Sequence, residues 1–559
     1  MAPSFNCKNC GHSLIRPDIQ LQQTPFNEIL QSNSSVPSSS IDHISSTVSV
    51  IQGFERELDT EIHHIQGVLA ELLAKRTALH SQAERLTALH HPIRRMPSEL
   101  LAEIFLQCID TPWIHDIGSG DYPVTETVDN FGQDLQWAPG RFVKLGKMPL
   151  VLSSVCALWR RVAIATSELW ASISLVIEPT HEATDLLLMG LWLERAREMP
   201  LFICLTNLDL GNHFDIISDL TSILNLFVSR SEQWRAVDLL LPFDTMQHLS
   251  SIRNRLSKLE WLSIGSSDDL DEPMVMSMFE VAPQLVSFQL AENLWPVNVV
   301  IPWAQLRHCD LGCTGSPQEY LGVLHLMPAL ETCRMHIAFG HDTFNLNSAP
   351  LQLRHLRSLT VNDKSVEPKF LSFLTAPALR HFSMKTLSFT PEAVSYTLAP
   401  WIKSHNQIQR LTLGSDLAMG RQDSRQFMLS LLEGVPDLQQ LHVLGEAASD
   451  ILNAPLTAFN VLSRLQVIIV DYELNHYRGD MHMGSLDISK FLDDLSSRIG
   501  MGLRRVEIRC NAYEGQSRSQ LKEGLQPELP VRLAELRSAG LDITLTYLGL
   551  DFFDEAAWA

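Results

Sequence analysis

Three residues near the amino terminus, Cys7, Cys10 and His12, have the types and spacing that could bind a metal ion. Two cysteines separated by two residues supply half of a structural zinc site, which needs four ligands. His12 lies too close to Cys10 to reach a third corner easily, and the chain has no second Cys-x-x-Cys. The pattern favours an unpaired pair of thiols, with a zinc ion shared between molecules as the alternative. We predict no resident metal and no cofactor.

The remaining candidates for chemistry are weaker. Cys309 and Cys313 are close in sequence, but their pattern places them in a repeat strand and its turn. The acidic run at 268–272 lacks the spacing of a calcium loop and is typical of a solvated loop. The sequence contains no phosphate-binding loop, dinucleotide-binding glycine fingerprint, His-Glu-x-x-His or Gly-x-Ser-x-Gly. We therefore predict that the protein is not an enzyme.

Composition narrows the class of protein further. The 559 residues include 43 Lys plus Arg and 64 Asp plus Glu, a net charge of −21, with 45% apolar residues and 9 cysteines. Such a charge disfavours binding to nucleic acid or to an anionic membrane. The few cysteines argue against a disulfide scaffold, and the start of the chain lacks the apolar region of a secretory signal. We expect a soluble intracellular protein, in the cytoplasm, the nucleus or both.

Residues 1–46 are rich in serine and poor in core-forming residues, so we predict a disordered tail. Residues 47–91 contain no proline and repeat every seven residues, which predicts a long amphipathic helix with coiled-coil character that Pro92 ends. The helix could self-associate, pack on its own chain or act as a spacer. One row of the repeat is apolar throughout: Ile51, Leu58, Ile65, Leu72, Leu79, Leu86 and Ile93. The second row is mixed: Phe54, Glu61, Val68, Lys75, Gln82 and Leu89.

Most of the architecture is predicted by a repeat of the form Leu-x-x-apolar-x-apolar. It occurs ten times between residues 259 and 508, with 21 to 38 residues from one copy to the next. Runs typical of helices separate several copies, and one begins with a capping box at Ser316 and Glu319. The copies start at Leu259, Leu285, Leu306, Leu330, Leu356, Leu379, Ile408, Leu438, Leu465 and Leu503.

A strand of about five residues followed by a helix, at about 27 residues per unit, resembles an irregular leucine-rich repeat. One such unit cannot bury its apolar face alone, whereas stacked units build a continuous core. We therefore predict an α/β solenoid with a parallel inner sheet over residues 179–548, followed by an acidic-aromatic tail at 549–559. Three weaker strands are expected earlier, starting near Leu169, Leu201 and Trp234.

Residues 92–178 have the pattern of a small helical module, interrupted by an acidic, glycine- and proline-containing insert at 111–147 that is typical of a loop. Leu101, Ile104 and Phe105 share one helical face, and Val155 and Trp159 share another. The module resembles the F-box, whose pattern is roughly Leu-Pro-x-Glu-Leu-Leu-x-x-Ile-Phe, then Val-Cys-x-x-Trp-Arg, then Leu-Trp. The matching residues are Pro97, Glu99, Leu100, Leu101, Ile104, Phe105, Val155, Cys156, Trp159, Arg160, Leu169 and Trp170.

The long insert departs from the short link usual in the family, but the arrangement is similar to fungal F-box-like proteins with leucine-rich repeats. The resemblance implies an all-α F-box module that docks on a Skp-type adaptor within a cullin ubiquitin ligase. Each matching residue could instead close the small core of the module. The residues that the resemblance places at the adaptor are Pro97, Leu100, Leu101, Ile104, Phe105, Val155, Cys156 and Trp159.

Basic residues recur at outward-facing positions of the predicted strands. Arginine pairs bidentately with carboxylate or phosphate, so these residues could form a stripe that binds an acidic or phosphorylated protein segment. Alternatively, they make ordinary contacts between neighbouring strands. They are Arg307, His308, Arg334, Arg357, Arg380, His381, Arg410, His442, Arg504 and Arg505.

The resemblance implies a function: the substrate receptor of a Skp–cullin–F-box ubiquitin ligase, with the repeats holding a target protein. Such a receptor performs no chemistry and acts by proximity. The alternative is a repeat scaffold that acts outside a ligase. The expected partners are the adaptor, the cullin and a protein substrate, with no nucleic acid and no membrane.

Overall fold

A computed structural model describes most of the chain in two units, residues 1–97 and 98–559, which are considered separately. The cysteine pair Cys7 and Cys10 with His12, for which no resident metal is predicted, the acidic run at 268–272 and the insert at 111–147 lie outside the described residues. The described residues are 35–89, 91–108, 148–177, 182–207, 217–267, 275–291, 293–337, 350–363, 369–386, 394–415, 431–445, 463–474, 491–493, 495, 499, 502–512, 529–547 and 550–551.

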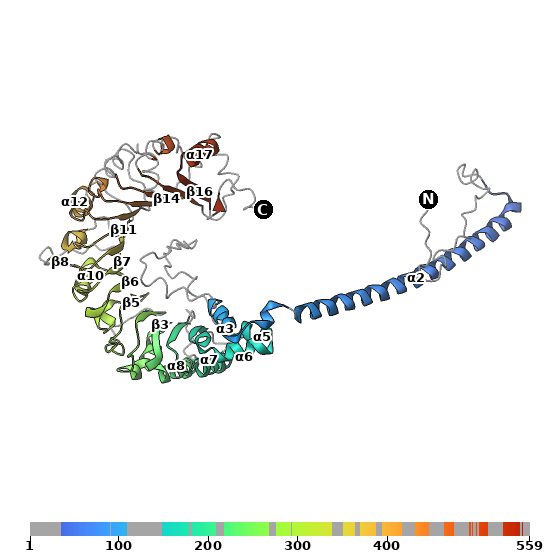
Figure 1. Ribbon diagram of the computed structural model, residues 1–559, viewed down its shortest axis with the longest axis horizontal. Coiled ribbons are helices and arrows are strands. Elements are labelled where there is room, and N and C mark those ends of the chain that lie inside the picture. Colours follow the sequence, from blue (N-terminus) through green and yellow to red (C-terminus); the bar gives the residue numbers. More distant parts are fainter. Residues whose placement is uncertain are drawn as a thin grey trace. The chain divides into compact units, whose positions relative to one another are not determined.

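The described part of the first unit includes a long helix, α2 (Ser38–Leu89), as the heptad pattern predicts (Figure 1). The helix begins inside the segment 1–46 that the composition predicts as disordered. Its first turn is closed by the Ser40 amide, which donates to the Pro37 carbonyl at 2.9 Å, and proline has a fixed φ suited to a helix start. The prediction was wrong here because serine is unfavourable in a helix interior but well suited to a helix beginning. The short helix η1 (Pro92–Arg95) follows, so α2 ends before Pro92 as expected.

The second unit begins with short helices that correspond to the predicted module. α3 and α5 each pack against α6, and the chain then enters a large sheet. The module's elements are α3 (Ser98–Gln107), α5 (Met148–Val155), α6 (Ala157–Ala165) and the 3-10 helix η3 (Ser167–Trp170).

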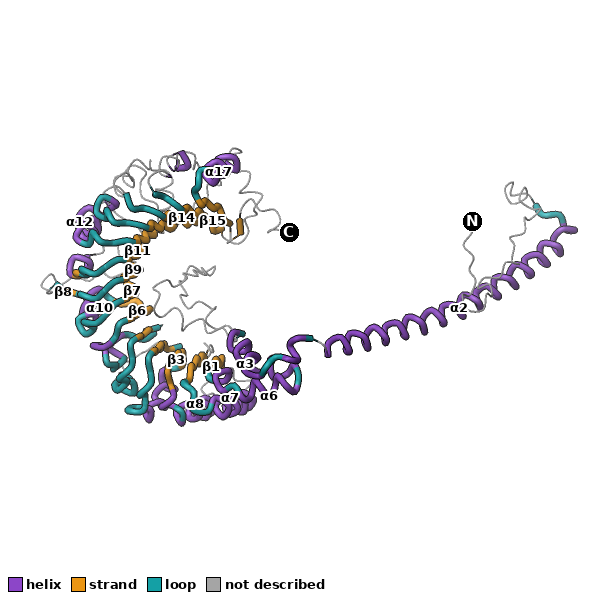
Figure 2. The backbone as a smooth tube through the Cα atoms, in the orientation of Figure 1, coloured by secondary structure: helices purple, strands orange, loops and turns teal. Residues whose placement is uncertain are grey.

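Within the described residues the sheet has 15 strands, and each strand pairs with the next strand of the sheet along the chain. All pairs are parallel except the last, in which β17 is antiparallel to β16. The strands lie on the inner side of the curve of this unit, and the helices lie on its outer side (Figure 2). The strands are β1 (Ser172–Ile177), β2 (Leu201–Asn207), β3 (Trp234–Leu241), β4 (Trp261–Ser266), β5 (Ser287–Leu290), β6 (His308–Gly315), β7 (Thr332–Ile337), β9 (Ser358–Asp363), β11 (His381–Thr386), β12 (Arg410–Ser415), β13 (Gln440–Gly445), β14 (Val467–Leu474), β15 (Arg505–Ala512), β16 (Asp542–Tyr547) and β17 (Leu550–Asp551).

The ten predicted repeats all contribute to this sheet. Every one of their signature side chains is buried, none more than 4% exposed, because the two strand positions point away from the inner face and the leading leucine closes the turn before the strand. The strands align without slippage through most of the stack, so that Cys333, Leu359 and Phe382 lie side by side. The described residues from β1 onward thus form a leucine-rich solenoid with a mainly parallel sheet, as the repeat predicts.

The outer elements are less regular than a helix per repeat. Ser316 and Glu319 form the predicted capping box at the start of α10, with the Ser316 amide donating to Glu319 Oε2 at 2.9 Å. Between Leu285 and Leu306, 21 residues apart, two 3-10 turns replace the expected helix, since so short a unit containing two prolines has no room for one. The outer elements include α7 (Glu182–Ala196), α8 (Ile217–Ser229), α9 (Phe243–Met246), η7 (Pro296–Asn298), η8 (Trp303–Gln305), α10 (Pro317–Leu324), α12 (Ala399–Ser404) and α17 (Leu529–Ser538). A two-stranded pair, β8 (Leu351–Gln352) and β10 (Leu374–Thr375), is separate from the main sheet.

The three weaker strands expected near Leu169, Leu201 and Trp234 are confirmed as β1, β2 and β3. The sheet therefore begins before the boundary placed at residue 179, directly after the 3-10 turn at Leu169 and Trp170. A second boundary also differs from the prediction. The segment 549–559 was expected to be a tail, yet β17 pairs with β16 through Tyr547 and Leu550. No described helix combines the length and apolarity required to cross a bilayer.

His405, at the end of α12, makes folding sensitive to acid. Its Nε2 accepts a hydrogen bond from the Ala376 amide at 3.0 Å, and its Nδ1 lies 2.7 Å from the Trp401 carbonyl, so the ring must be neutral. Burial lowers the pKa of His405 below its usual value of 6.5. The unfolded chain therefore takes up the proton first, and stability should fall as the pH drops below about 6.5.

Urea unfolding at pH 7.5 and 5.5 checks this expectation. The wild-type midpoint should drop at the lower pH, and His405→Gln should show a smaller drop because it removes the titrating group. The remaining dependence would come from other groups, including His308, whose pKa is also lowered by burial. Equal pH dependence in both proteins would contradict the assignment.

Candidate functional site

The module buries one apolar face of α3 and exposes another. Leu101 and Phe105 are fully buried, and the Phe105 ring packs against the Trp159 ring of α6, with 4.9 Å between centroids. Leu100 and Ile104, one turn apart on the same helix, are 56% and 44% exposed. The same pattern of residues thus supplies both a core and an uncovered apolar row.

A second apolar row lies on α5. Val151 and Val155 are one helical turn apart and exposed, and Met148 extends the row towards the beginning of the helix. Met148 and Val151 were not among the predicted site residues, although the run of apolar residues at 148–152 was a signal that could have indicated them. Two helices that pack on α6 therefore each present exposed aliphatic side chains.

Cys156 and Arg160 hold the joint between α5 and α6. The Cys156 thiol accepts a hydrogen bond from the Trp159 amide at 3.5 Å and so caps α6. The Arg160 guanidinium donates to the Ser153 carbonyl at 2.9 Å. These two residues therefore fix the angle between the helices.

Trp170 joins the module to the first repeat. Its indole N–H donates to the Ala163 carbonyl of α6 at 2.7 Å, while its ring meets Trp192 of α7 edge to face at 4.8 Å. The Arg195 guanidinium lies 4.3 Å from the same ring, within range of a cation–π contact. One fully buried side chain thus contacts elements of both the module and the solenoid.

The eight residues predicted at the adaptor divide into two groups. Leu101 and Phe105 belong to the core of the module, and Trp159 is half-buried against that core. The other five are exposed: Pro97, Leu100, Ile104, Val155 and Cys156. Pro97 belongs to the first unit and the other seven to the second.

The predicted basic stripe does not follow one line along the sheet. Residues at equivalent positions of neighbouring strands form columns, and the ten basic residues occupy three of them. The first column lies one residue before the strands, where backbone hydrogen bonds between neighbouring repeats already begin. It contains Arg307, Arg357, Arg380 and Arg504. His308, His381, Arg410 and Arg505 form the first position of their strands. Arg334 and His442 lie two residues further on.

Acidic side chains alternate with these cations. Glu331 lies between Arg307 and Arg357 in the column before the strands, with ion-pair distances of 3.3 and 3.7 Å. Asp310 pairs with Arg334 across neighbouring strands at 3.8 Å. These contacts between strands agree with the alternative interpretation of the arginines, and partly exposed surface pairs of this kind contribute about 1 kcal/mol each.

A denser polar network crosses β13, β14 and β15 on the inner face. His442 Nε2 lies 2.8 Å from Asp471 Oδ2, and the Arg509 guanidinium lies 3.7 Å from Asp471 Oδ1. Arg509 also donates to Glu507 at 3.0 Å, and Arg505 pairs with the same carboxylate. Sequence reasoning included His442 but missed the two acids, because acidic residues were considered only in loops.

Three of the buried cysteines have unreactive thiols. Burial raises the pKa of the Cys204 and Cys333 thiols strongly, and that of Cys510 to about 11, so all three are protonated at neutral pH. A protonated thiol is a poor nucleophile and a poor metal ligand. Among the residues that the structure describes, no group of three or more His, Cys, Asp or Glu side chains could hold a metal ion.

Comparisons with known proteins add little. No protein-family profile matches the chain, and no curated protein matches it. Among solved structures, the crystal structure of a TLR13–ssRNA13 complex is similar, with 14% identity and a TM-score of 0.29. The match covers 56% of this chain and 48% of that chain, and so less than half of the other protein. The fold assignment rests on the strand register and burial described above.

Proposed function

We propose that this protein is the substrate receptor of a Skp–cullin–F-box ubiquitin ligase. The observation that carries the proposal is the exposure of Leu100, Ile104 and Val155, which match the F-box pattern but are not buried by the module. Apolar residues left uncovered on two helices that pack on the same helix, α6, favour an interaction surface. Leu101 and Phe105, which also match the pattern, are instead buried in the core of the module.

The solenoid that follows the module supplies a surface for a second protein. Acidic side chains lie among the basic residues of its inner face, and such a mixed surface suits a partner segment carrying both kinds of charge better than a purely acidic one. The protein would act by holding this partner near the ligase, since proximity raises the effective concentration of a target lysine. No chemical step is assigned to the chain itself.

The proposal is tested by capture of the Skp adaptor and the cullin with the full chain. The wild type should retain both subunits, whereas Leu100→Asp combined with Ile104→Asp should weaken adaptor binding about 100-fold or more, because two anchors lose their apolar contact. Leu101 is unsuitable for this test because its replacement would damage the core.

The matched control is Leu187→Asp combined with Val531→Asp, which adds the same charges at exposed apolar positions of α7 and α17. This control should bind like the wild type. Wild-type binding by the α3 variant would contradict the assigned surface. A wild-type chain that captures neither subunit would instead support a scaffold acting outside a ligase.

A further inference from the structure

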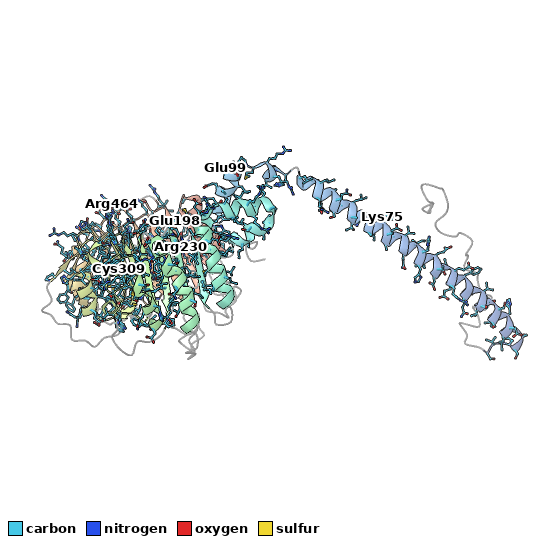
Figure 3. All side chains as sticks on the ribbon, turned by 90° about the horizontal axis from the view of Figure 1, so that it is seen from below. Lys75, Glu99, Glu198, Arg230, Cys309 and Arg464 are labelled. Atoms are coloured by element: carbon cyan, nitrogen blue, oxygen red, sulfur yellow. The ribbon has the colours of Figure 1, made fainter. Side chains whose placement is uncertain are left out.

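The helix α2 carries an uncovered apolar row along most of its 52 residues. The row consists of Ile51, Leu58, Ile65, Leu72, Leu79 and Leu86, and these side chains are 36–66% exposed. Side chains project from all sides of the helix, Lys75 among them (Figure 3). A helix of this composition gains most of its stability by packing its apolar row against another helix.

The second row of the heptad decides which orientation a second copy can take. In a parallel pair, Glu61 would face the partner's Glu61 and Lys75 would face the partner's Lys75, because equivalent positions meet. Like charges in the seam would destabilise that arrangement. In an antiparallel pair, residues of the first row instead pack beside residues of the second row.

We propose that α2 forms an antiparallel coiled coil with a second copy of this chain, in which Ile65 packs beside the partner's Val68. This alignment places Leu58 beside the partner's Lys75 and Leu72 beside the partner's Glu61. Each charged side chain then lies against an aliphatic one and can extend its charged end into water. No two like charges share a layer of the seam.

The residues flanking the seam fit the same alignment. Glu55 lies opposite the partner's Arg76, and His64 lies opposite the partner's Glu71. Ile62 lies opposite the partner's Leu69. Both side chains are exposed in the single helix, and this pairing would cover them beside the seam. Opposite charges and apolar contacts on the flanks set the orientation and register of paired helices.

The glycines of α2 do not interrupt this seam. Gly53 and Gly67 occupy the same heptad position on the outer face, and a Cβ at either would meet nothing within 4 Å. With a rise of about 1.5 Å per residue, the carboxyl ends of the two helices would lie about 70 Å apart. The inference does not depend on the proposed ligase function.

Sedimentation equilibrium of the full chain tests the proposal. The wild type should be a dimer, and Glu55→Arg or Arg76→Glu alone should weaken dimerisation about tenfold, because each places two pairs of like charges across the interface. The combined variant Glu55→Arg with Arg76→Glu should restore wild-type affinity. Because these residues lie about 30 Å apart along one helix, such a rescue can arise only between copies.

Arg56→Glu is the matched control, since Arg56 adjoins Glu55 but lies on the outer face, and it should leave the dimer unchanged. A monomer at tens of micromolar would overturn the proposal, as would a trimer or tetramer. A parallel pair would place Glu71 opposite the partner's Arg76. Rescue of Arg76→Glu by Glu71→Arg but not by Glu55→Arg would therefore also overturn it. Circular dichroism would report whether each variant keeps its helix.

Discussion

Replacing Leu359 with aspartate is expected to lower the stability of the solenoid by about 4 kcal/mol or more and to split its unfolding into two steps. Leu359 is fully buried in β9, in register with Cys333 of β7 and Phe382 of β11. A carboxylate at this position would lose its contact with water beside Cys333 and Phe382, neither of which can neutralise its charge. Because each repeat of a solenoid is stabilised mainly by its neighbours, one damaged repeat uncouples the two sides.

Thr360→Asp is the matched control for this change. Thr360 is the next residue of the same strand, is half-buried on the inner face, and lies in register with Arg334. The same charge should therefore change stability by no more than about 0.5 kcal/mol. Urea unfolding followed by circular dichroism, with limited proteolysis at intermediate urea, would distinguish the two variants. A single transition with an unchanged midpoint for Leu359→Asp would contradict the expectation.

Trp170→Ala is expected to cost about 3–5 kcal/mol, because it removes a fully buried aromatic side chain. It also leaves the Ala163 carbonyl without its indole donor and removes the contacts with Trp192 and Arg195. Since this side chain contacts both α6 and α7, both helices should lose stability. Hydrogen exchange of α6, η3 and α7 amides should accelerate while that of β11 to β13 stays unchanged.

Trp295→Ala is the control, because Trp295 is an exposed residue of the solenoid. Its replacement should lower the free energy of unfolding by less than about 1 kcal/mol. Trp170→Phe should have an intermediate effect, since it keeps an aromatic ring but loses the hydrogen bond to Ala163. If Trp170→Ala exchanged like the wild type, the module and the first repeat would have to be joined by other contacts.

The solenoid could be predicted because stacking of repeats requires apolar residues at fixed positions of each unit. Leucine before the strand and apolar residues at its second and fourth positions are what stacking requires, so positions such as Leu356, Leu359 and Val361 could be read directly. The outer elements could not, because a connection of 21 residues and one of 38 can reach the next strand by different routes. The start of α2 was missed because Ser38 and its neighbours look alike in a disordered tail and at a helix beginning.

The candidate site was predicted in part. The sequence pattern singled out the apolar residues of α3 but could not separate Leu100 from Leu101, since exposure depends on which face of α3 meets α6. The basic residues were identified as outward-facing, but their arrangement in three columns depends on register, and Glu331 between Arg307 and Arg357 depends on which strands are neighbours. One-dimensional spacing does not contain that information.

The order of strands in the sheet has a consequence for how the chain is made. Each strand of the main sheet pairs with the preceding strand of that sheet along the chain, so no strand has to wait for a distant part of the chain. Contacts between repeats span only 21 to 38 residues of sequence, whatever the length of the protein. Low contact order of this kind favours rapid folding, and domains fold as they leave the ribosome. The sheet can therefore grow one strand at a time during translation, with β1 as its template.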